Sequence, residues 1–360
     1  MYDTVFRYNI IYSRLTGYDA HRFLLVALVR KQPRRPIRSL LQADAPMTGA
    51  AILRPIDFHS HHIPSDWQPL LPRDLALAQR ERWARINRRI ADAGALMEAI
   101  DHGDLDGRVV NIPTALFTPP GETTPADTFR RVNDSVAEVT ARAPGRLHGL
   151  ASVDAFSGDE GAAELVRAVR RLGLRGAFIE SAQGDLLLDA PEAKPTLAAA
   201  SELGVPVFVH PVNPAALVRR MARYSETGIL FARGQVNAAS LIALIESGRL
   251  DEFPALPIIV TTLALGGILL EAAFNRNFLS GSTNVLQRQV YVDTMGFHPS
   301  LIRLSVEVLG IGHVLAGSDW PIVNDAPIAG RLVRALAAAG IDAAGSDLIA
   351  VGNARRLLGI

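Results

Sequence analysis

The chain of 360 residues contains no cysteine. Without thiols there can be no disulfide framework, no cysteine nucleophile, no cysteine-ligated iron–sulfur cluster and no thiolate zinc site. Lysine is nearly absent, because Lys31 and Lys194 are the only two, and each lies in a proline-containing stretch typical of solvated positions. A lysine Schiff-base mechanism is therefore disfavoured. Any transition metal must be held by histidine and carboxylate side chains.

A strong net charge is also absent, since the formal charge is +1 at pH 7 and 49% of the residues are hydrophobic. This balance argues against a disordered chain, and it gives no whole-chain reason to expect nucleic acid or a membrane as a partner. The charge is nevertheless uneven. Residues 1–46 carry eight basic and three acidic side chains, a net of +5, which leaves a net of −4 for the rest.

We interpret residues 1–46 as a basic N-terminal extension, disordered or not native, and residues 47–360 as a single barrel domain. Residues 23–29 are apolar, but seven residues cannot span a bilayer, and no small-residue cleavage site follows them. Met47 precedes the first clear strand and is a candidate initiator. The alternative is a helix that packs on the body. We expect a cytoplasmic protein.

Short β-rich runs alternate with segments of helical period. In residues 159–172, for example, the apolar positions 162, 165, 166, 169 and 172 share one helix face. Eight such units predict a (β/α)8 TIM barrel of the metal-dependent hydrolase type. A doubly wound sheet competes, but the first strand is not followed by a glycine-rich dinucleotide turn. The predicted strands cover residues 55–58, 108–112, 147–153, 176–179, 205–209, 256–261, 290–293 and 313–316.

Histidines and acids gather at the predicted strand ends, where barrel enzymes carry their chemistry. His59 and His61 follow the first strand and, two residues apart, point to the same face of an extended chain. His210 follows the fifth strand and Asp319 the eighth. Three imidazoles and one carboxylate suit Zn²⁺, with Mn²⁺ as the alternative. We therefore predict one divalent metal ion at this end of the barrel.

Four segments carry a resemblance to a known family: residues 56–64, 203–211, 317–321 and 353–359. They resemble the amidohydrolase-related family that includes aminocarboxymuconate semialdehyde decarboxylase and the resorcylate-type decarboxylases. The resemblance covers residues 52–360 and implies that His59, His61, His210 and Asp319 are the metal ligands. It also implies a zinc or manganese enzyme, and a homodimer.

The chain departs from that family at the sixth strand, where a catalytic histidine in a His-x-Gly-Gly context is expected. Thr262 or Ala264 stands there, depending on register, and neither is a general acid or base near neutral pH. Candidate replacements are His298, which is otherwise a plain loop histidine, and Glu180, which is otherwise a salt-bridged structural residue. His62 is expected to pack against the neighbouring helix.

Substrate contacts are predicted from the segments after the first two strands. Trp67, Asn111 and Phe117 are expected in loops, where they line a pocket for a flat ring or simply pack together. The basic run at residues 80–89 is typical of a solvated helix face. The alternative is that one of its arginines binds a substrate carboxylate, with Arg82, Arg85 and Arg88 as equal candidates.

We therefore predict a metal-dependent decarboxylase, a carbon–carbon lyase, that acts on a small carboxylated aromatic or unsaturated substrate. The alternative is a metal-dependent hydrolase of a lactone, an amide or a related bond. Metal-bound water would be its nucleophile and Asp319 its proton acceptor, so no histidine after the sixth strand is needed. The second alternative is a degenerate barrel that binds metal without turnover.

Overall fold

The computed structural model describes residues 53–67, 77–118, 122–275, 284–324 and 327–360. The chain divides into two units, Met1–Ala51 and Ile52–Ile360. The fold described below is that of the second unit. The predicted basic extension, residues 1–46, lies outside the described residues, as does Lys31.

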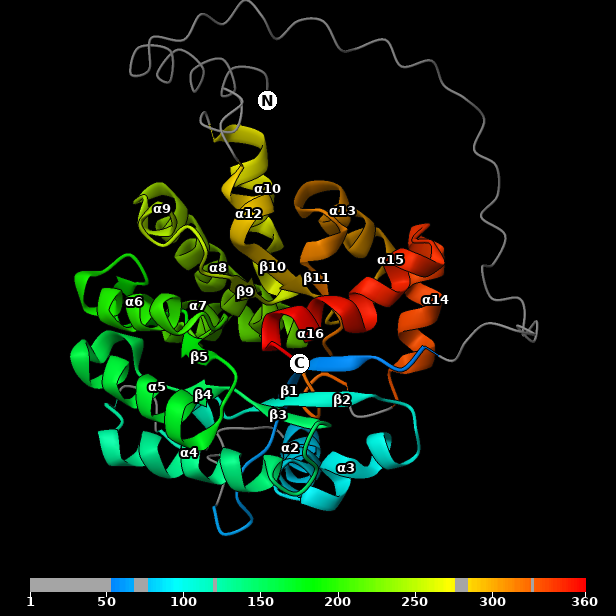
Figure 1. Ribbon diagram of the computed structural model, residues 1–360, viewed down its shortest axis with the longest axis horizontal. Coiled ribbons are helices and arrows are strands. Elements are labelled where there is room, and N and C mark those ends of the chain that lie inside the picture. The colour runs from blue at the N-terminus through cyan, green and yellow to red at the C-terminus, as the bar shows by residue number, and fades with distance from the viewer. Residues whose placement is uncertain (1–52, 68–76, 119–121, 276–283, 325–326) are drawn as a thin grey trace, which may run out of the picture. The chain divides into compact units, whose positions relative to one another are not determined.

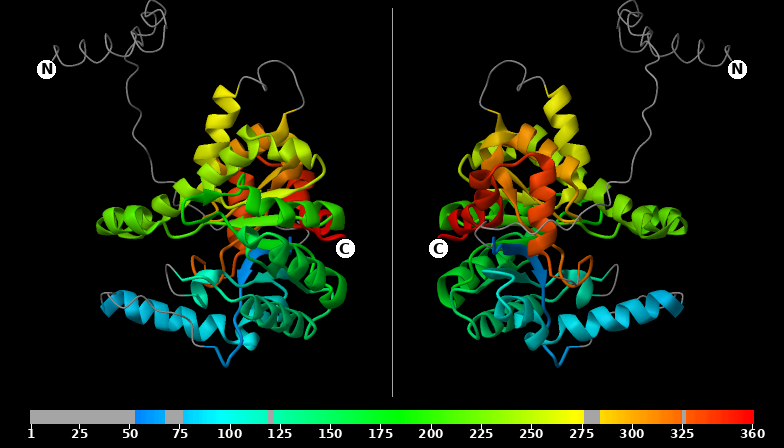
Figure 2. Two further views of the ribbon diagram at one scale, coloured as in Figure 1. Left: turned by 90° about the vertical axis from the view of Figure 1, so that its left-hand side faces the viewer. Right: turned by 90° about the vertical axis from the view of Figure 1, so that its right-hand side faces the viewer.

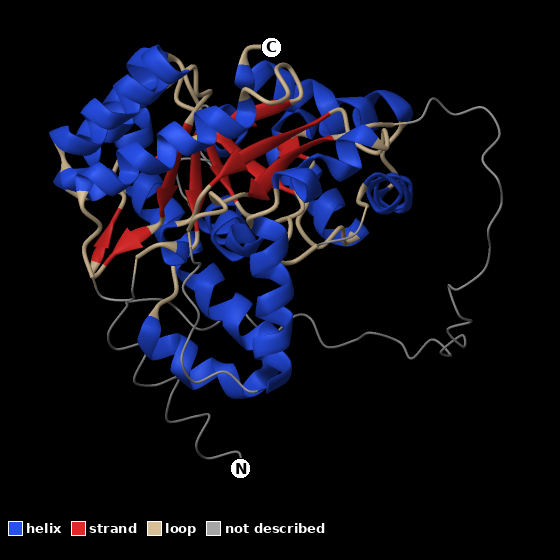
Figure 3. Ribbon diagram, turned by 90° about the horizontal axis from the view of Figure 1, so that it is seen from below, coloured by secondary structure: helices blue, strands red, loops and turns tan. Residues whose placement is uncertain are grey.

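Parallel strands form a ring at the centre of this unit, and helices surround it (Figure 1, Figure 3). Two short strands, β3 and β4, are parts of one run divided at Leu150, whose N–H donates to the carbonyl of Val110. A hydrogen bond from Phe58 N to Ala316 O joins the first strand to the chain after the last one. The predicted eight-stranded barrel is therefore confirmed. Its strands are β1 (Ile56–His61), β2 (Gly107–Asn111), β3 (Leu147–Gly149) with β4 (Ala151–Ser152), β5 (Ala177–Glu180), β8 (Val207–His210), β9 (Ile258–Val260), β10 (Val290–Asp293) and β11 (Val314–Leu315).

The helices follow the strands in alternation, and a small antiparallel pair, β6 (Ala182–Gln183) and β7 (Leu186–Leu187), interrupts one connection. The helix predicted at residues 159–172 forms with those bounds. The helices are α2 (Leu77–Ile90), α3 (Ala93–Asp101), α4 (Ala126–Thr140), α5 (Asp159–Leu172), α6 (Lys194–Leu203), α7 (Ala215–Met221), α8 (Ser225–Glu246), α9 (Arg249–Glu252), α10 (Leu265–Phe274), α12 (Val285–Gln289), α13 (Pro299–Leu309), α14 (Ala329–Ala339), α15 (Ala343–Asp347) and α16 (Asn353–Leu358), with the short turn η6 (Thr262–Ala264) after β9.

Two helical segments, α2 and the α7–α8 pair, project beyond the barrel on the same side (Figure 2). An ion pair between Arg82 of α2 and Glu226 of α8, at 3.4 Å, links them. The stretch Ala215–Glu246 is long and apolar enough, by length and composition, to cross a membrane, but half of its most apolar window is buried inside the protein. Such burial is typical of a helix that packs against a globular core.

The interior of the barrel has an apolar layer directly below the predicted site. Phe178 of β5 and Phe208 of β8 belong to it, together with residues from the other strands and from α16. Alternate side chains of a strand face the same side. The residues two positions further along, Glu180 and His210, therefore also face the interior, one layer closer to the carboxyl ends of the strands, and the same relation holds for Asp293 of β10.

The first strand has a bulge that changes which side chains face inward. Its pairing with β2 shifts register between Asp57 and Ser60, so that Phe58 and His59 together oppose one residue of β2. A bulge of this kind re-aims side chains. Phe58 therefore contributes to the apolar layer, while His59 and His61 both reach the ring of His210. The prediction that this strand ends at Phe58 was wrong, because it continues to His61.

Candidate metal centre

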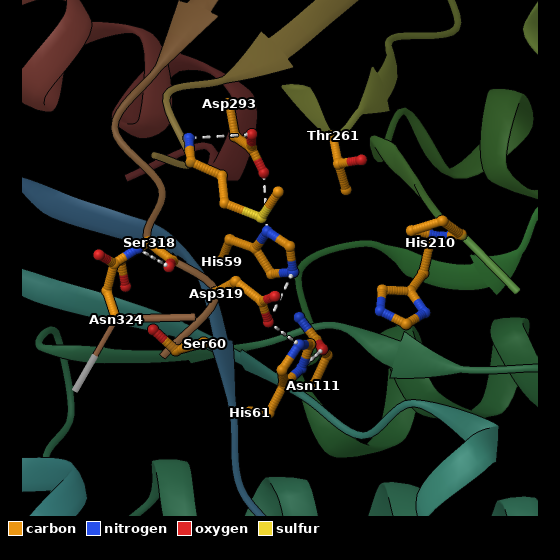
Figure 4. Close-up of polar contacts among 12 residues, drawn as sticks. His59, Ser60, His61, Asn111, His210, Thr261, Asp293, Ser318, Asp319 and Asn324 are labelled. Carbon is orange, nitrogen blue, oxygen red and sulfur yellow. Dashed lines mark hydrogen bonds and ion pairs between the residues drawn. The ribbon is translucent and has the colours of Figure 1, made fainter. Parts of the chain in front are cut away.

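Three imidazoles converge at the carboxyl end of the barrel. His59, His61 and His210 are buried, and each offers a ring nitrogen within 4.8 Å of the other two. Asp319 Oδ1 lies 2.9 Å from His61 Nε2 and 3.6 Å from His59 Nε2 (Figure 4). The structure thus brings together the four residues that were predicted as metal ligands.

The second ring nitrogen of each histidine is held by a neighbouring side chain, which fixes the direction of the ring. The three Nδ1 contacts are His59 to Asp293 Oδ2 at 2.7 Å, His61 to Asn111 Oδ1 at 2.7 Å, and His210 to Glu180 Oε2 at 3.1 Å. An acceptor at Nδ1 places the proton of a neutral imidazole there and leaves Nε2 as a lone-pair donor. His59 Nε2 is buried and, among the described residues, has no hydrogen-bond partner. These features fit one divalent ion bound by the Nε2 atoms and by Asp319.

The charges at the site also favour a cation. Burial opposes ionisation of Asp319, but His59, His61 and Arg233 bring its pKa down to about 2, so it is ionised at neutral pH. Burial lowers the pKa of His210 to about 4 against the effect of Glu180, which leaves a neutral ring. At His59 burial has the same sense, yet Asp319 and other nearby carboxylates raise the pKa above its usual value. A bound metal cation would neutralise the negative charge of Asp319, and the imidazole nitrogens beside it could coordinate the same ion.

A buried ion pair supports the segment that presents Asp319. The Asp319 backbone has φ +56°, a left-handed conformation that few residues other than glycine, asparagine and aspartate adopt. Ser318 donates to Asp57 from its N–H at 2.9 Å and from its hydroxyl at 2.6 Å. Arg108 donates to the same carboxylate at 2.7 Å and lies over the ring of Trp320, 4.7 Å from its centroid. Asp57 therefore holds the backbone before Asp319, and Arg108 packs on the side chain that follows it.

Glu180 contacts a metal-site histidine instead of facing open space. Besides His210, it accepts hydrogen bonds from the N–H and the hydroxyl of Thr114, at 2.9 and 2.5 Å. Burial raises the pKa of Glu180, but the interaction with His210 and the hydrogen bonds from Thr114 outweigh it and hold the pKa below its ordinary value. The structure therefore gives Glu180 a positioning contact, and its catalytic role stays a prediction.

Thr262, one of the two candidates for the place of the missing histidine, faces an anchoring carboxylate. Thr262 donates to Asp293 Oδ1 from its N–H at 2.9 Å and from its hydroxyl at 2.8 Å. His298 is exposed at the start of α13, and it lines a narrow cavity with Thr262, Asp293 and the α13 residue Ile302. Within the described ranges, no hydrogen bond links His298 to the ligand set. Its role as a replacement base stays a prediction.

The predicted substrate contacts fall at different places. The rings of Trp67 and Phe117 touch edge to face, with centroids 5.8 Å apart. Asn111 was wrongly expected in a loop: it is the last residue of β2 and holds His61. Arg85 is exposed and lines a cavity of about 440 Å³ beside Pro321, together with Arg82, Arg88 and their neighbours on α2 and α3.

Sequence reasoning missed Arg233, a residue of α8. Its Nη2 lies 3.2 Å from His210 Nε2, and its Nε and Nη2 donate to the carbonyl of Pro211 at 3.4 and 3.1 Å. It lies within a helix, whereas the sequence prediction of the metal site considered only residues at the carboxyl ends of the strands. The signal available was that Arg233 is the only charged residue between Glu226 and Glu246 of an otherwise apolar helix.

A closed barrel with this ligand set defines a metal-dependent enzyme of the amidohydrolase type. The amidohydrolase family model matches residues 56–360, so the chain belongs to the amidohydrolase family. Among curated relatives, the gamma-resorcylate decarboxylase of Rhodococcus jostii (strain RHA1) is 30% identical over 272 residues, which cover 67% of this chain and 81% of the relative. The 2-amino-3-carboxymuconate-6-semialdehyde decarboxylase of Dictyostelium discoideum is 23% identical over 310 residues, which cover 78% of this chain and 85% of the relative.

Solved structures of decarboxylases have the same fold. The 2,6-dihydroxybenzoate decarboxylase from Rhizobium aligns with a TM-score of 0.67 at 25% identity and covers 85% of this chain and 98% of its own. The dihydroxybenzoic acid decarboxylase of Polaromonas sp. JS666, which contains manganese and the inhibitor 2-nitroresorcinol, aligns with a TM-score of 0.70 at 23% identity, with coverages of 85% and 97%. The predicted family, the barrel, and a metal-dependent enzyme whose chemistry is decarboxylation in preference to hydrolysis are confirmed.

Proposed function

We propose that this chain removes the carboxyl group of a small hydroxylated aromatic acid in a metal-dependent, non-oxidative reaction. The observation that carries the proposal is the anchoring of all three Nδ1 atoms, which directs three Nε2 atoms and Asp319 toward one another. The relatives act on aromatic or unsaturated acids, as their names state. A bound divalent ion would supply Lewis-acid chemistry, holding substrate oxygens and stabilising negative charge as the carboxyl group leaves.

Asp319 is the residue best placed to move the proton. Decarboxylation breaks the bond between the ring carbon and the carboxylate, releases CO₂, and requires that one proton be delivered to that carbon. Because its pKa is about 2, Asp319 is ionised at neutral pH and must first take a proton from a substrate hydroxyl or from water. It can then return this proton to the ring carbon. Such a route needs no histidine after β9.

The remaining assignments are also proposals. Three imidazoles and one carboxylate support Zn²⁺, whereas the Polaromonas structure with manganese supports Mn²⁺. A homodimer is supported by apolar side chains left exposed on α8 and α10, namely Phe231, Leu270 and Phe274. We propose a small carboxylated molecule as the substrate. We also propose a cytoplasmic location, which rests on the sequence alone.

The experiment incubates the metal-loaded protein with 2,6-dihydroxybenzoate, related hydroxylated aromatic acids and a set of lactones, and follows released CO₂ and acid. We expect CO₂ from an aromatic acid, loss of turnover after chelation, and recovery when the metal is returned. Asp319→Asn should lower turnover by about 10²- to 10⁴-fold, whereas Asp185→Asn, at an exposed turn, should not change it.

Other outcomes would contradict the proposal in different ways. Hydrolysis of a lactone without CO₂ would favour the hydrolase alternative. Stoichiometric metal without turnover on any compound would favour the degenerate barrel. Full turnover in His298→Ala would remove His298 as a replacement base, and a loss equal to that of Asp319→Asn would assign the proton to His298 instead.

A further inference from the structure

Arg233 brings a fixed positive charge to the metal centre. Its Nη2 points at His210 Nε2, the nitrogen that the Glu180 contact leaves free for the metal. Two hydrogen bonds to the carbonyl of Pro211 hold one side of the guanidinium. No described residue accepts a hydrogen bond from Nη1. One edge of the guanidinium is thus fixed, while the other has N–H donors to spare.

The packing of α8 determines where this charge lies. A Cβ atom at Gly234 would stand 2.7 Å from the carbonyl oxygen of Leu263, so only glycine lets the helix approach η6 this closely. One turn later, the Asn237 side-chain amide donates to the carbonyl of Val209 in β8 at 3.1 Å. Its oxygen accepts a hydrogen bond from the Thr261 hydroxyl, just after β9, at 3.0 Å. Arg233 is therefore held at the ends of β8 and β9.

A metal ion and Arg233 cannot share the same lone pair of His210. When Nε2 binds an ion, the Nη2 proton must find another acceptor. A guanidinium next to a divalent cation is repelled unless an anion lies between them. A carboxylate meets both requirements, because it accepts two parallel N–H bonds from arginine.

We propose that Arg233 binds the carboxylate of the substrate beside the metal ligands and so selects for carboxylated rings. This inference rests on the proposed function and names the group that one residue of its site recognises. The carboxylate leaves as neutral CO₂, so Arg233 contributes mainly to binding of the substrate. Loss of the guanidinium should therefore raise KM more than it lowers kcat.

The test measures equilibrium binding of two probes to the metal-loaded protein by calorimetry. Benzoate carries the carboxylate but lacks the hydroxyl groups of the expected substrates, and resorcinol carries hydroxyl groups but no carboxylate. Arg233→Gln should weaken benzoate binding by about 10-fold or more and resorcinol binding by less than about 2-fold. Arg233→Lys should lie between Gln and the wild type for benzoate. Arg220→Gln, an exposed residue of α7, is the matched control and should change neither.

Metal content and thermal unfolding of each variant separate this role from a structural one. Arg233→Gln should keep stoichiometric metal and an unchanged melting temperature. Loss of metal, equal weakening of both probes, unchanged benzoate binding, or no benzoate binding by the wild type would each overturn the proposal. Failure of the proposed function would look different, because benzoate would still bind through Arg233 while no aromatic acid released CO₂.

Discussion

The metal histidines owe their orientation to three different acceptors, a glutamate, an aspartate and an asparagine amide. Glu180 is the most informative, because the sequence left open whether it acts in catalysis or in structure. In the structure it accepts from His210 and from both donors of Thr114. Partners of this kind orient a ligand and raise its basicity. The same contacts let mutation separate the two roles.

A substitution that removes the Glu180 oxygen contacting His210 Nδ1 should weaken metal binding, and a substitution that retains such an oxygen should not. We expect Glu180→Ala to lower metal affinity by about 10- to 100-fold, measured by titration against a competing chelator. Glu180→Gln retains an oxygen that can accept from His210, and should bind metal within a few-fold of the wild type and keep its turnover. Glu226→Ala, on the exposed end of α8, is the control. If Glu180→Gln held its metal and lost turnover, Glu180 would be a catalytic residue instead.

At the scale of elements, the sequence predicted the barrel and its ligands because both follow local rules. Strand runs, the helix at residues 159–172 and the acids and histidines at strand ends are visible in short windows of sequence. The bulge in β1 is not, since it depends on the pairing of β1 with β2. Arg233 was missed for a similar reason: its position depends on the contact of α8 with η6, which joins residues distant in sequence. The support of Asp319 by Asp57 and Arg108 spans most of the chain and has no local signature.

The contact between α8 and η6 gives a prediction at this scale. In Gly234→Ala the added methyl group would lie 2.7 Å from the carbonyl oxygen of Leu263, so the helix must shift and carry Arg233 with it. We expect a loss of about 1–3 kcal/mol in the free energy of unfolding and weaker benzoate binding. Gly266→Ala, in the exposed face of α10, meets no atom within 4 Å and should be neutral or stabilising. Chemical denaturation of both variants checks this, and equal stability of the two would show that α8 can move without cost.

For the whole molecule, pH should act through histidines that the fold buries in neutral form. His62 was expected to pack against the neighbouring helix, and it does so through a hydrogen bond with the backbone of Ile90, the last residue of α2. Burial lowers its pKa to about 4, and the pKa values of His148 and His313 are also lowered, with burial again the main cause. None of the three belongs to the ligand set, so their effect can be measured in protein freed of metal.

The sign of this effect follows from proton binding. Between the unfolded pKa of about 6.5 and the folded pKa of about 4, the unfolded chain binds a proton at His62 that the folded chain does not. Stability must therefore fall as the pH drops through this window and level off below it, with a contribution from His62 on the order of 3 kcal/mol. We expect the metal-free His62→Gln variant to lose less unfolding free energy than the wild type over the same pH window, by about the His62 contribution. Denaturation at a series of pH values measures this difference. The exposed His102→Gln should keep the full acid dependence, and an unchanged pH profile in His62→Gln would show that the His62 ring takes up its proton equally well in both states.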